Sequence, residues 1–367
     1  MAKFMRKQKL AMLLFCIAIA LLLAACSSTN PSDSQTVPGA DSPPGFTRHQ
    51  SGFLDTFDTY IQILIYTETP QEFNAHFTAA RDAFMRYHAL FDIFNSYDGI
   101  YNINTINENA GIAPVPVDQA IIDLLLVSRQ AYFDSDGALN ITLGPVLSIW
   151  HEYRTHGLAN PDSAAIPSYA DLRQAAALAD INGLIIDEET GTVFLAQEGM
   201  SLDVGAVAKS FAVGRVAELL RERGVIAAVV DAGGDIATIG GSMADGGRPW
   251  GIGVRDPLTN GMFDSVRVYS MSAATSGNNH RTYMVDAIAY NHIIDPVTLM
   301  PATNFASVTV VHEDINIAEM LSTALFILSF EIGYDLAQAF DAAVIWIFDD
   351  GTAESNERYR ELSANFN

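Results

Sequence analysis

Apolar residues recur with two different periods from Phe53 onward, and this alternation limits the possible folds more than any other feature. Phe53–Tyr66 alternates between apolar and polar residues in its second half, which predicts a strand, and residues 72–95 have helical spacing. Further helices are expected at 119–132, with Asp118 as its cap, 168–179, 205–223, 316–330 and 333–340. Strands are expected at 137–143, in a hairpin over 183–200 that turns at 189–191, and at 225–233, 236–239, 249–257, 265–277, 307–313 and 341–350. Strands often follow strands, so the expected class is α+β, with a mixed, largely antiparallel sheet packed with helices.

The first 25 residues have the pattern of a secretory signal. Four basic residues precede an apolar run from Leu10 to Leu23, and the run ends in "LAAC" at Leu23–Cys26. Small residues before a cysteine are typical of a lipoprotein cleavage site. The alternative is an uncleaved membrane anchor, for which the run is short. Either reading predicts an exported chain.

The two cysteines of the sequence fall in or next to this segment. Cys16 leaves with the signal and Cys26 is the expected site of lipidation, so the mature fold would have no disulfide. Residues 26–50 are rich in Ser, Pro and Asp and are expected to form a flexible tether. The catalytic body then spans 51–367, and an acylated Cys26 would anchor it to the outer side of the cell membrane.

The chain is strongly acidic, with a formal net charge of −23. Nucleic acid requires a basic face, so this charge argues against it as a partner. If the ligand is a phosphate, a cation must reduce the repulsion, and a metal ion is the simplest one.

The segment "SLDVGAVAKSFAV" places a carboxylate, small glycine and alanine residues and a lysine around an expected helix start. It lacks the glycine before lysine that a phosphate-binding P-loop requires. Asp203 is expected to cap the helix through its carboxylate. Lys209 is expected either to pair with a carboxylate or to reach a phosphate.

Glu319 and Thr323 lie four residues apart and therefore share one face of the helix expected at 316–330. A carboxylate and a hydroxyl at this spacing suit a hard cation such as Mg²⁺. A solvated helix edge would show the same pattern.

Three loops are further candidates. His292 lies in "NHIIDP" and can be either structural or catalytic. Arg281 ends the "TSGNNHR" loop, which can face an anion or be an ordinary polar loop. The glycine pair in "DAGGDI" permits close approach of the backbone but is weak evidence of a site.

Taken in order, six segments resemble the motifs of the ApbE family, the FAD:protein FMN transferases. They are "DSDGALNITLGPVLSIW", "SLDVGAVAKSFAV", "VVDAGGDI", "ATSGNNHRTY", "NHIIDPVTLMPA" and "AEMLSTALFIL". The resemblance covers nearly the whole chain after residue 53 and implies an ApbE-like, T-fold-like architecture. It also implies a Mg²⁺-dependent enzyme that cleaves FAD and transfers FMN to a threonine or serine hydroxyl of an exported or membrane flavoprotein. Some relatives instead hydrolyse FAD to FMN and AMP, and a lipid-anchored FAD-binding protein without catalysis is a third possibility.

The resemblance assigns a metal site and a base. The metal ligands map to the backbone oxygen of Ala208 and the side chains of Glu319 and Thr323. The family pattern has aspartate at the position of Glu319, and the extra methylene moves the carboxylate by about 1.5 Å, which bears on Mg²⁺ geometry. His292 maps to the family histidine that takes the proton of the acceptor hydroxyl.

The resemblance also assigns flavin or adenine contacts. They map to Phe57, Ala138, Leu139, Asn140, Gly205, Phe211 and Ile294. Phe57 and Asn140 replace the more usual methionine and aspartate. The loop "SGNNHRTY" departs from the usual "SGDY", so part of the cofactor loop differs from the family pattern.

Overall fold

A computed structural model describes residues 35–36, 45–244, 247–259, 261–278 and 281–366. The chain divides into two units, residues 1–35 and 36–367, and the description below concerns the second. The expected signal peptide and Cys26 lie outside the described residues. Among the described helices, none combines the length and the apolar character that crossing a membrane requires.

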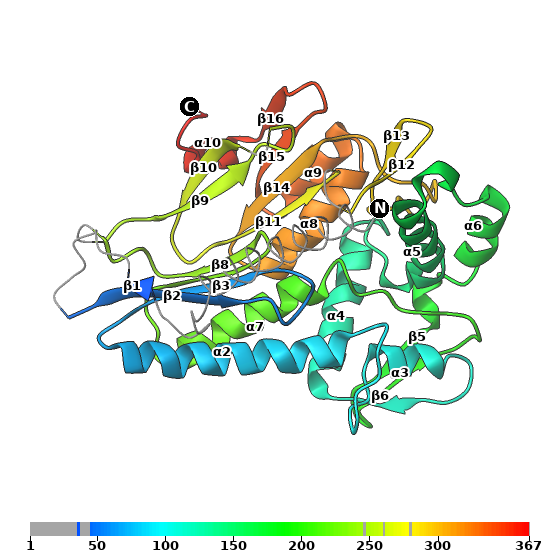
Figure 1. Ribbon diagram of the computed structural model, residues 1–367, viewed down its shortest axis with the longest axis horizontal. Coiled ribbons are helices and arrows are strands. Elements are labelled where there is room, and N and C mark those ends of the chain that lie inside the picture. Colours follow the sequence, from blue (N-terminus) through cyan, green and yellow to red (C-terminus); the bar gives the residue numbers. More distant parts are fainter. Residues whose placement is uncertain (1–34, 37–44, 245–246, 260, 279–280, 367) are drawn as a thin grey trace, which may run out of the picture. The chain divides into compact units, whose positions relative to one another are not determined.

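One long antiparallel sheet organises the second unit, in the order β2-β3-β7-β8-β11-β14-β15-β16 (Figure 1). Its strands are β2 (Thr47–Phe53), β3 (Ile61–Thr67), β7 (Ala228–Ala232), β8 (Asp235–Ile239), β11 (Ser272–Gly277), β14 (Ser307–His312), β15 (Ala343–Ile347) and β16 (Ala353–Ser355). Every neighbouring pair in this series is antiparallel. The two-residue strand β1 (Gln35–Thr36) falls at the boundary between the units along the sequence.

Helices cover one face of this sheet. They are α2 (Pro70–Phe91), α7 (Ala208–Glu222), α8 (Ile315–Ile327) and α9 (Phe330–Ala339), while α3 (Ile103–Glu108) and α4 (Gln119–Asp134) pack against these helices. The main hydrophobic core lies between them and the sheet and includes the fully buried Phe84, Phe326 and Trp346. The α+β class with a largely antiparallel sheet is therefore confirmed.

The other face of the sheet is covered by the hairpin β9 (Trp250–Arg255) and β10 (Met262–Val268) with α10 (Glu357–Leu362), which form a second core (Figure 1). The buried carboxylate of Asp264 fixes α10 there. It accepts hydrogen bonds from Tyr359 Oη (2.9 Å), Ser363 Oγ (2.6 Å) and Asn365 Nδ2 (2.9 Å). The sequence analysis did not predict α10.

A smaller layer forms around α5 (Gly144–Ala159). It contains α6 (Tyr169–Ala176) and the ribbon β12 (Tyr283–Val285) and β13 (Ile288–Tyr290), while β4 (Val115–Pro116), β5 (Leu184–Asp187) and β6 (Thr192–Leu195) form a separate sheet. The β5–β6 hairpin and the Asp118 cap confirm the sequence prediction, because the Asp118 side chain accepts the Ala120 N–H.

The structure corrects two local predictions. Residues 137–143 do not form a strand. The Asn140 side chain accepts hydrogen bonds from the backbone N–H (2.9 Å) and the hydroxyl (2.7 Å) of Thr142, which starts a short 3-10 turn at Ile141–Leu143. Asp203 does not cap the following helix. Helix α7 begins later, at Ala208 after Val207, and Asp203 Oδ1 accepts the N–H of Gly205 (2.8 Å) in the preceding loop.

Candidate functional site

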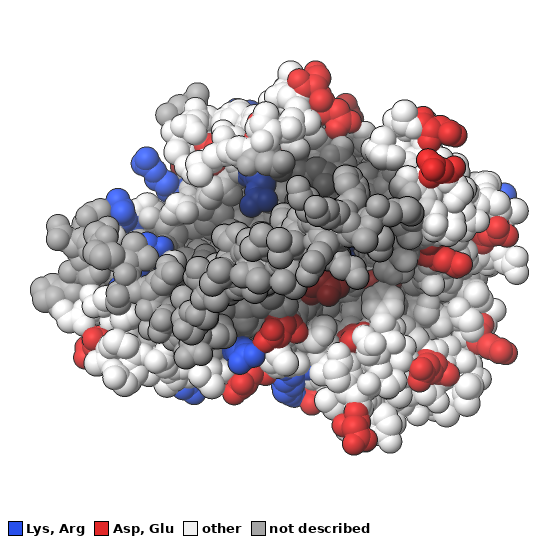
Figure 2. All heavy atoms as spheres, in the orientation of Figure 1, with Lys and Arg blue, Asp and Glu red and all other residues white. Residues whose placement is uncertain are grey.

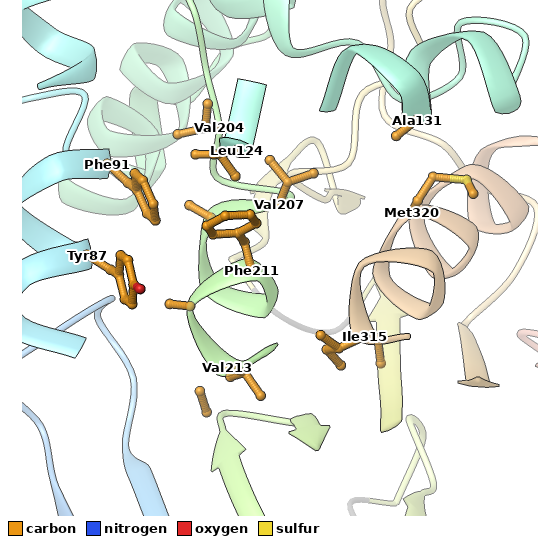
Figure 3. Packing of buried hydrophobic residues seen from close by; sticks show 14 of the residues in the cluster. Tyr87, Phe91, Leu124, Ala131, Val204, Val207, Phe211, Val213, Ile315 and Met320 are labelled. Atoms are coloured by element: carbon orange, nitrogen blue, oxygen red, sulfur yellow. The ribbon is translucent and has the colours of Figure 1, made fainter. Parts of the chain in front are cut away.

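Helices α7 and α8 pack side by side and antiparallel, and this arrangement brings the predicted metal ligands together. Contact is close where Gly214 faces Ile315, since a Cβ on Gly214 would lie 2.7 Å from Ile315 Cγ2. On one side of this contact, α7 extends back to its first residue, Ala208. On the same side, α8 extends forward from Ile315 to its middle (Figure 3). Ala208 therefore lies at the same end of the helix pair as Glu319 and Thr323.

A carboxylate that the sequence analysis did not select joins this group. Asp235 is the first residue of β8, its side chain is 5% exposed, and it forms an ion pair with Lys209. It also faces Glu319, whose Oε2 is buried and accepts no hydrogen bond from the described residues. Lys209 thus pairs with a carboxylate, one of the two alternatives that its sequence position left open.

Burial and like charge act together on these acids. Burial, with the nearby charge of Asp235, raises the pKa of Glu319 well above its ordinary value, and Lys209 opposes the shift. The pKa of Asp231 is raised by burial and by Asp235 as well. Lys209 therefore serves Glu319, Asp235 and Asp231, while Arg255 also acts on Asp231, and the buried pair of Glu319 and Asp235 favours a further positive charge.

Hydroxyl groups complete the donor set. Thr323 is 9% exposed, and its Oγ1 lies 3.3 Å from Ser276 Oγ, which also contacts Ser322 Oγ at 3.0 Å. No cluster of three or more His, Cys, Asp or Glu suited to a metal occurs in the described ranges. The set of two carboxylates, a threonine hydroxyl and a backbone carbonyl consists of oxygen alone, and the buried Oε2 of Glu319 lacks a donor, so the residues fit a hard cation such as Mg²⁺.

The loop before α7 lies against the segment that begins α5. Asp203 N–H donates to the Ile141 carbonyl (2.8 Å), and a Cβ on Gly144 would lie 2.4 Å from the Ser201 carbonyl oxygen. This contact places the predicted cofactor residues Ala138, Leu139 and Asn140 beside the loop that carries Gly205. The close approach of backbones explains why glycine stands at 144.

Basic side chains lie near Asp203 in this loop. Burial raises the pKa of Asp203, and the charges of His151, Arg281 and Arg154 oppose that rise. His151 and Arg154 come from α5, where Arg154 Nη2 lies 2.9 Å from His151 Nδ1. The sequence analysis considered Arg281 but neither of the α5 residues.

The turn between β2 and β3 carries Phe57 and approaches the glycine pair before Asp235. Phe57 has a left-handed φ of 55°, and its ring packs edge-on against Phe84 and His88. A Cβ on Gly233, where φ is +63°, would lie 2.1 Å from Thr59 Oγ1. The glycine pair thus permits the turn that aims Asp235 at Glu319.

Two predicted cofactor residues are buried in hydrophobic clusters that include residues of these loops. Phe211 is 4% exposed and points toward Tyr87 and Phe91 in the main core (Figure 3). Ile294 is 4% exposed and packs in the cluster around Trp150 of α5. Their predicted contacts with flavin or adenine stay predictions.

His292 follows β13 in a loop with internal support. Asn291 Nδ2 donates to the Ala302 carbonyl (2.8 Å), and Asn291 Oδ1 accepts the N–H of Ile293 (2.8 Å). Asp295 forms the next turn by accepting the Val297 N–H (2.8 Å) and the Thr298 hydroxyl (2.9 Å). These contacts hold the Asp295 carboxylate within the turn that follows His292.

A surface cavity of about 780 Å³ lies apart from these loops. It is lined by the later turns of α7, including Arg215 and Arg221, and by the start of α8, including Asp314 and Ile315. The metal-binding candidates are not among its lining residues.

Comparison with known proteins gives a consistent result. The model of the ApbE family matches residues 57–346. The FAD:protein FMN transferase of Treponema pallidum is 34% identical over 282 residues, which cover 71% of this chain and 75% of the relative. The protein of the same name from Klebsiella pneumoniae is 32% identical over 254 residues, covering 66% and 76%.

Solved structures share the fold. The crystal structure of the ApbE protein from Thermotoga maritima superposes with a TM-score of 0.75 at 25% identity, covering 86% of this chain and 99% of that one. The flavin transferase ApbE from Vibrio cholerae gives a TM-score of 0.73 at 23% identity, with coverage of 86% and 99%. The similarity extends over most of the described sheet and helices.

Proposed function

We propose, from the premise that this chain belongs to the ApbE family, that it is an FAD:protein FMN transferase that uses Mg²⁺ and a threonine or serine acceptor. In the reaction the acceptor hydroxyl oxygen bonds to the FMN phosphorus of FAD, the bridging phosphorus–oxygen bond breaks, and AMP leaves. The hydroxyl proton passes to a base.

The observation that carries this proposal is the buried group of Glu319, Asp235 and Lys209 beside Thr323 and Ala208. The carboxylates of Glu319 and Asp235 face each other, and Lys209 forms an ion pair with Asp235. Glu319 Oε2 has no donor among the described residues. Such a group favours a bound divalent cation, and that cation in turn favours a diphosphate in a chain with a net charge of −23.

Each part of the site has a distinct task in this proposal. Glu319, Thr323 and the Ala208 carbonyl would hold Mg²⁺, which neutralises charge on the diphosphate and leaving group when bound. His292 accepts the hydroxyl proton at its imidazole, and the loops at Asn140 and Gly205 position FAD. Phosphoryl transfer depends mainly on such in-line positioning and charge neutralisation.

The reaction can be tested with FAD, Mg²⁺ and the membrane flavoproteins of a host that lacks its own transferase. We expect AMP release together with a flavin-fluorescent protein band that survives denaturing electrophoresis. Glu319→Gln should abolish both, while Glu331→Gln, a change to an α9 residue outside the site, should leave both intact. Release of AMP without a fluorescent band would favour FAD hydrolysis, and unchanged FAD would favour a non-catalytic binding protein.

The cellular location is part of the proposal. The "LAAC" sequence supports cleavage before Cys26 and anchoring of the exported enzyme by lipid at that residue. Metabolic labelling with a palmitate analogue should label the wild-type chain and not Cys26→Ser. Equal labelling of both would contradict the anchor.

A further inference from the structure

The β12–β13 ribbon is an isolated two-stranded sheet beside the His292 loop (Figure 1). Its register pairs Tyr283 with Tyr290 and Met284 with Ala289. Within the described parts of the chain, no third strand pairs with either edge. The ribbon therefore leaves backbone donors and acceptors available along its edges.

The inner side of the ribbon is fixed to α5. Tyr283 is 2% exposed and donates its hydroxyl to the Ala165 carbonyl (3.0 Å), and Tyr290 stacks on Trp150 with ring centroids 6.1 Å apart. Trp150 Nε1 also donates to the Leu299 carbonyl (2.9 Å) in the loop after His292. The ribbon and the His292 loop are thus held by the same helix.

The outer side of the ribbon is apolar and exposed. Met284 is 53% exposed and lies opposite Ala289, on the side that faces away from Tyr283 and Tyr290 because side chains alternate along a strand. Ile288 at the tip is 57% exposed and falls on the same side as Tyr290, two residues along the strand. Apolar side chains of this size on an unpaired ribbon are typical of a surface that a partner covers.

The base of the ribbon is cationic, in contrast to the rest of this region. Arg281 precedes β12. Burial lowers the pKa of Arg154, and the positive charge of Arg281 lowers that pKa further. Asp203 is the one described carboxylate whose charge raises the Arg154 pKa in return. On the face shown in Figure 2, acidic side chains predominate over the half that carries α5 and α6. Arg281, which is exposed, and Arg154 on α5 are the basic groups at the base of the ribbon that can pair with a carboxylate.

We propose that the β12–β13 ribbon binds an extended, acidic segment of the acceptor protein. The segment adds to the ribbon as a further strand, with apolar side chains on Met284 and a carboxylate at Arg154 and Arg281. This inference rests on the proposed function, because transfer requires a protein hydroxyl at His292, and β13 ends two residues before His292. Backbone pairing would supply affinity and the arginines would supply preference for acidic sequences.

Peptide binding tests the proposal directly. The probes are fluorescein-labelled nonapeptides with one central threonine, apolar residues at alternate positions and either two glutamates or two lysines. Fluorescence anisotropy with the full chain, FAD and Mg²⁺ should show at least tenfold tighter binding of the acidic peptide. Met284→Ser and Arg281→Gln should each weaken that binding at least fivefold. The matched controls Ile185→Ser, 48% exposed on β5, and Arg267→Gln on β10 should not.

A second readout separates this inference from the proposed function. AMP release from FAD with water as acceptor should be the same in Met284→Ser as in the wild type, while the KM for the acceptor protein rises and kcat changes little. Equal binding of acidic and basic peptides, or wild-type binding by both ribbon variants, would overturn the docking site even if AMP release is normal. Self-association in sedimentation that Met284→Ser abolishes would assign the ribbon to a second copy of this chain and would also overturn it. Absence of AMP release from the wild type in the presence of FAD, Mg²⁺ and the acceptor protein would instead refute the proposed function.

Discussion

Replacing Lys209 with methionine tests the electrostatic account of the site. Lys209 is the ammonium that pairs with Asp235, and its charge also lowers the pKa of Glu319 and Asp231. Methionine keeps much of the side-chain volume but removes the charge. The variant therefore leaves the buried carboxylates without their cation.

The expected magnitude follows from burial. Removing one partner of a fully buried ion pair costs about 3–5 kcal/mol. The Lys209 side chain is 24% exposed and that of Asp235 5%, so water screens the pair in part. We therefore expect Lys209→Met to lower the free energy of unfolding by about 2–3 kcal/mol without metal. Mg²⁺ at 100 times its Kd returns about 2.7 kcal/mol, so saturating Mg²⁺ should restore most of the loss.

Urea unfolding in EDTA and in excess Mg²⁺ measures both effects. Arg215→Met is the matched control on the same helix, because Arg215 pairs with Glu218 where both side chains are about half exposed, at 46% and 52%. This surface pair should contribute less than about 1 kcal/mol in either condition. The double variant Lys209→Met/Asp235→Asn removes both charges and should regain stability in EDTA but respond less to Mg²⁺.

Two results would refute the reasoning. Lys209→Met with wild-type stability in EDTA would mean that the carboxylates do not depend on the ammonium. A loss of stability that Mg²⁺ does not reverse would mean that no divalent cation binds beside Glu319 and Asp235.

Four further changes have definite expected outcomes. His292→Ala should abolish transfer but retain FAD binding in a fluorescence titration, and equal activity would contradict its role as base. Glu319→Asp should keep or raise activity at limiting Mg²⁺, and a large fall would mean that the site depends on the longer side chain. Burial lowers the pKa of His49. The stability that its neutral imidazole contributes is therefore complete above about pH 6.5 and is lost as pH falls through the lower pKa of the folded state. In urea unfolding, His49→Phe should reduce the pH dependence of the free energy of unfolding by up to about 1.4 kcal/mol per pH unit. Tyr359→Phe should cost about 1–3 kcal/mol, because the buried Asp264 loses a hydroxyl donor, and an unchanged urea midpoint would contradict this.

The sequence predicted the fold well where apolar residues keep either the helical or the strand spacing over a long segment. Helix α4 begins at the residue that follows the Asp118 cap, and the β5–β6 hairpin turns where the glycine lies. Prediction was wrong at residues 137–143, where the apolar pattern of a strand competes with the side chain of Asn140. That side chain makes a local hydrogen bond to Thr142, which no period reveals.

The candidate site was predicted only in part because its members come from segments far apart in the sequence. Glu319 and Thr323 share one helix, so their spacing carried a signal. Asp235 lies in a strand, and its role depends on the pairing of β7 with β8 and on the packing of α7. The glycine pair before Asp235 was the one sequence feature that pointed to this position. Both glycines have a left-handed φ, and they form the turn that leads into β8. The α5 residues around Asp203 had no comparable signal.

The positions of the charges explain how an acidic protein can attract a diphosphate. A net charge of −23 repels phosphate at long range, but salt screens that repulsion beyond about 8 Å at physiological ionic strength. Local charges therefore decide binding, and the two sets of cationic groups differ in what they can do. Lys209 forms an ion pair with the buried Asp235, so its charge is neutralised unless another cation takes its place beside that carboxylate. Arg154 and Arg281 have Asp203 as a shared counter-charge and keep an excess of positive charge. In the proposed function, the carboxylate group would therefore make the diphosphate site depend on a metal ion, while the arginines would be available for a second anion.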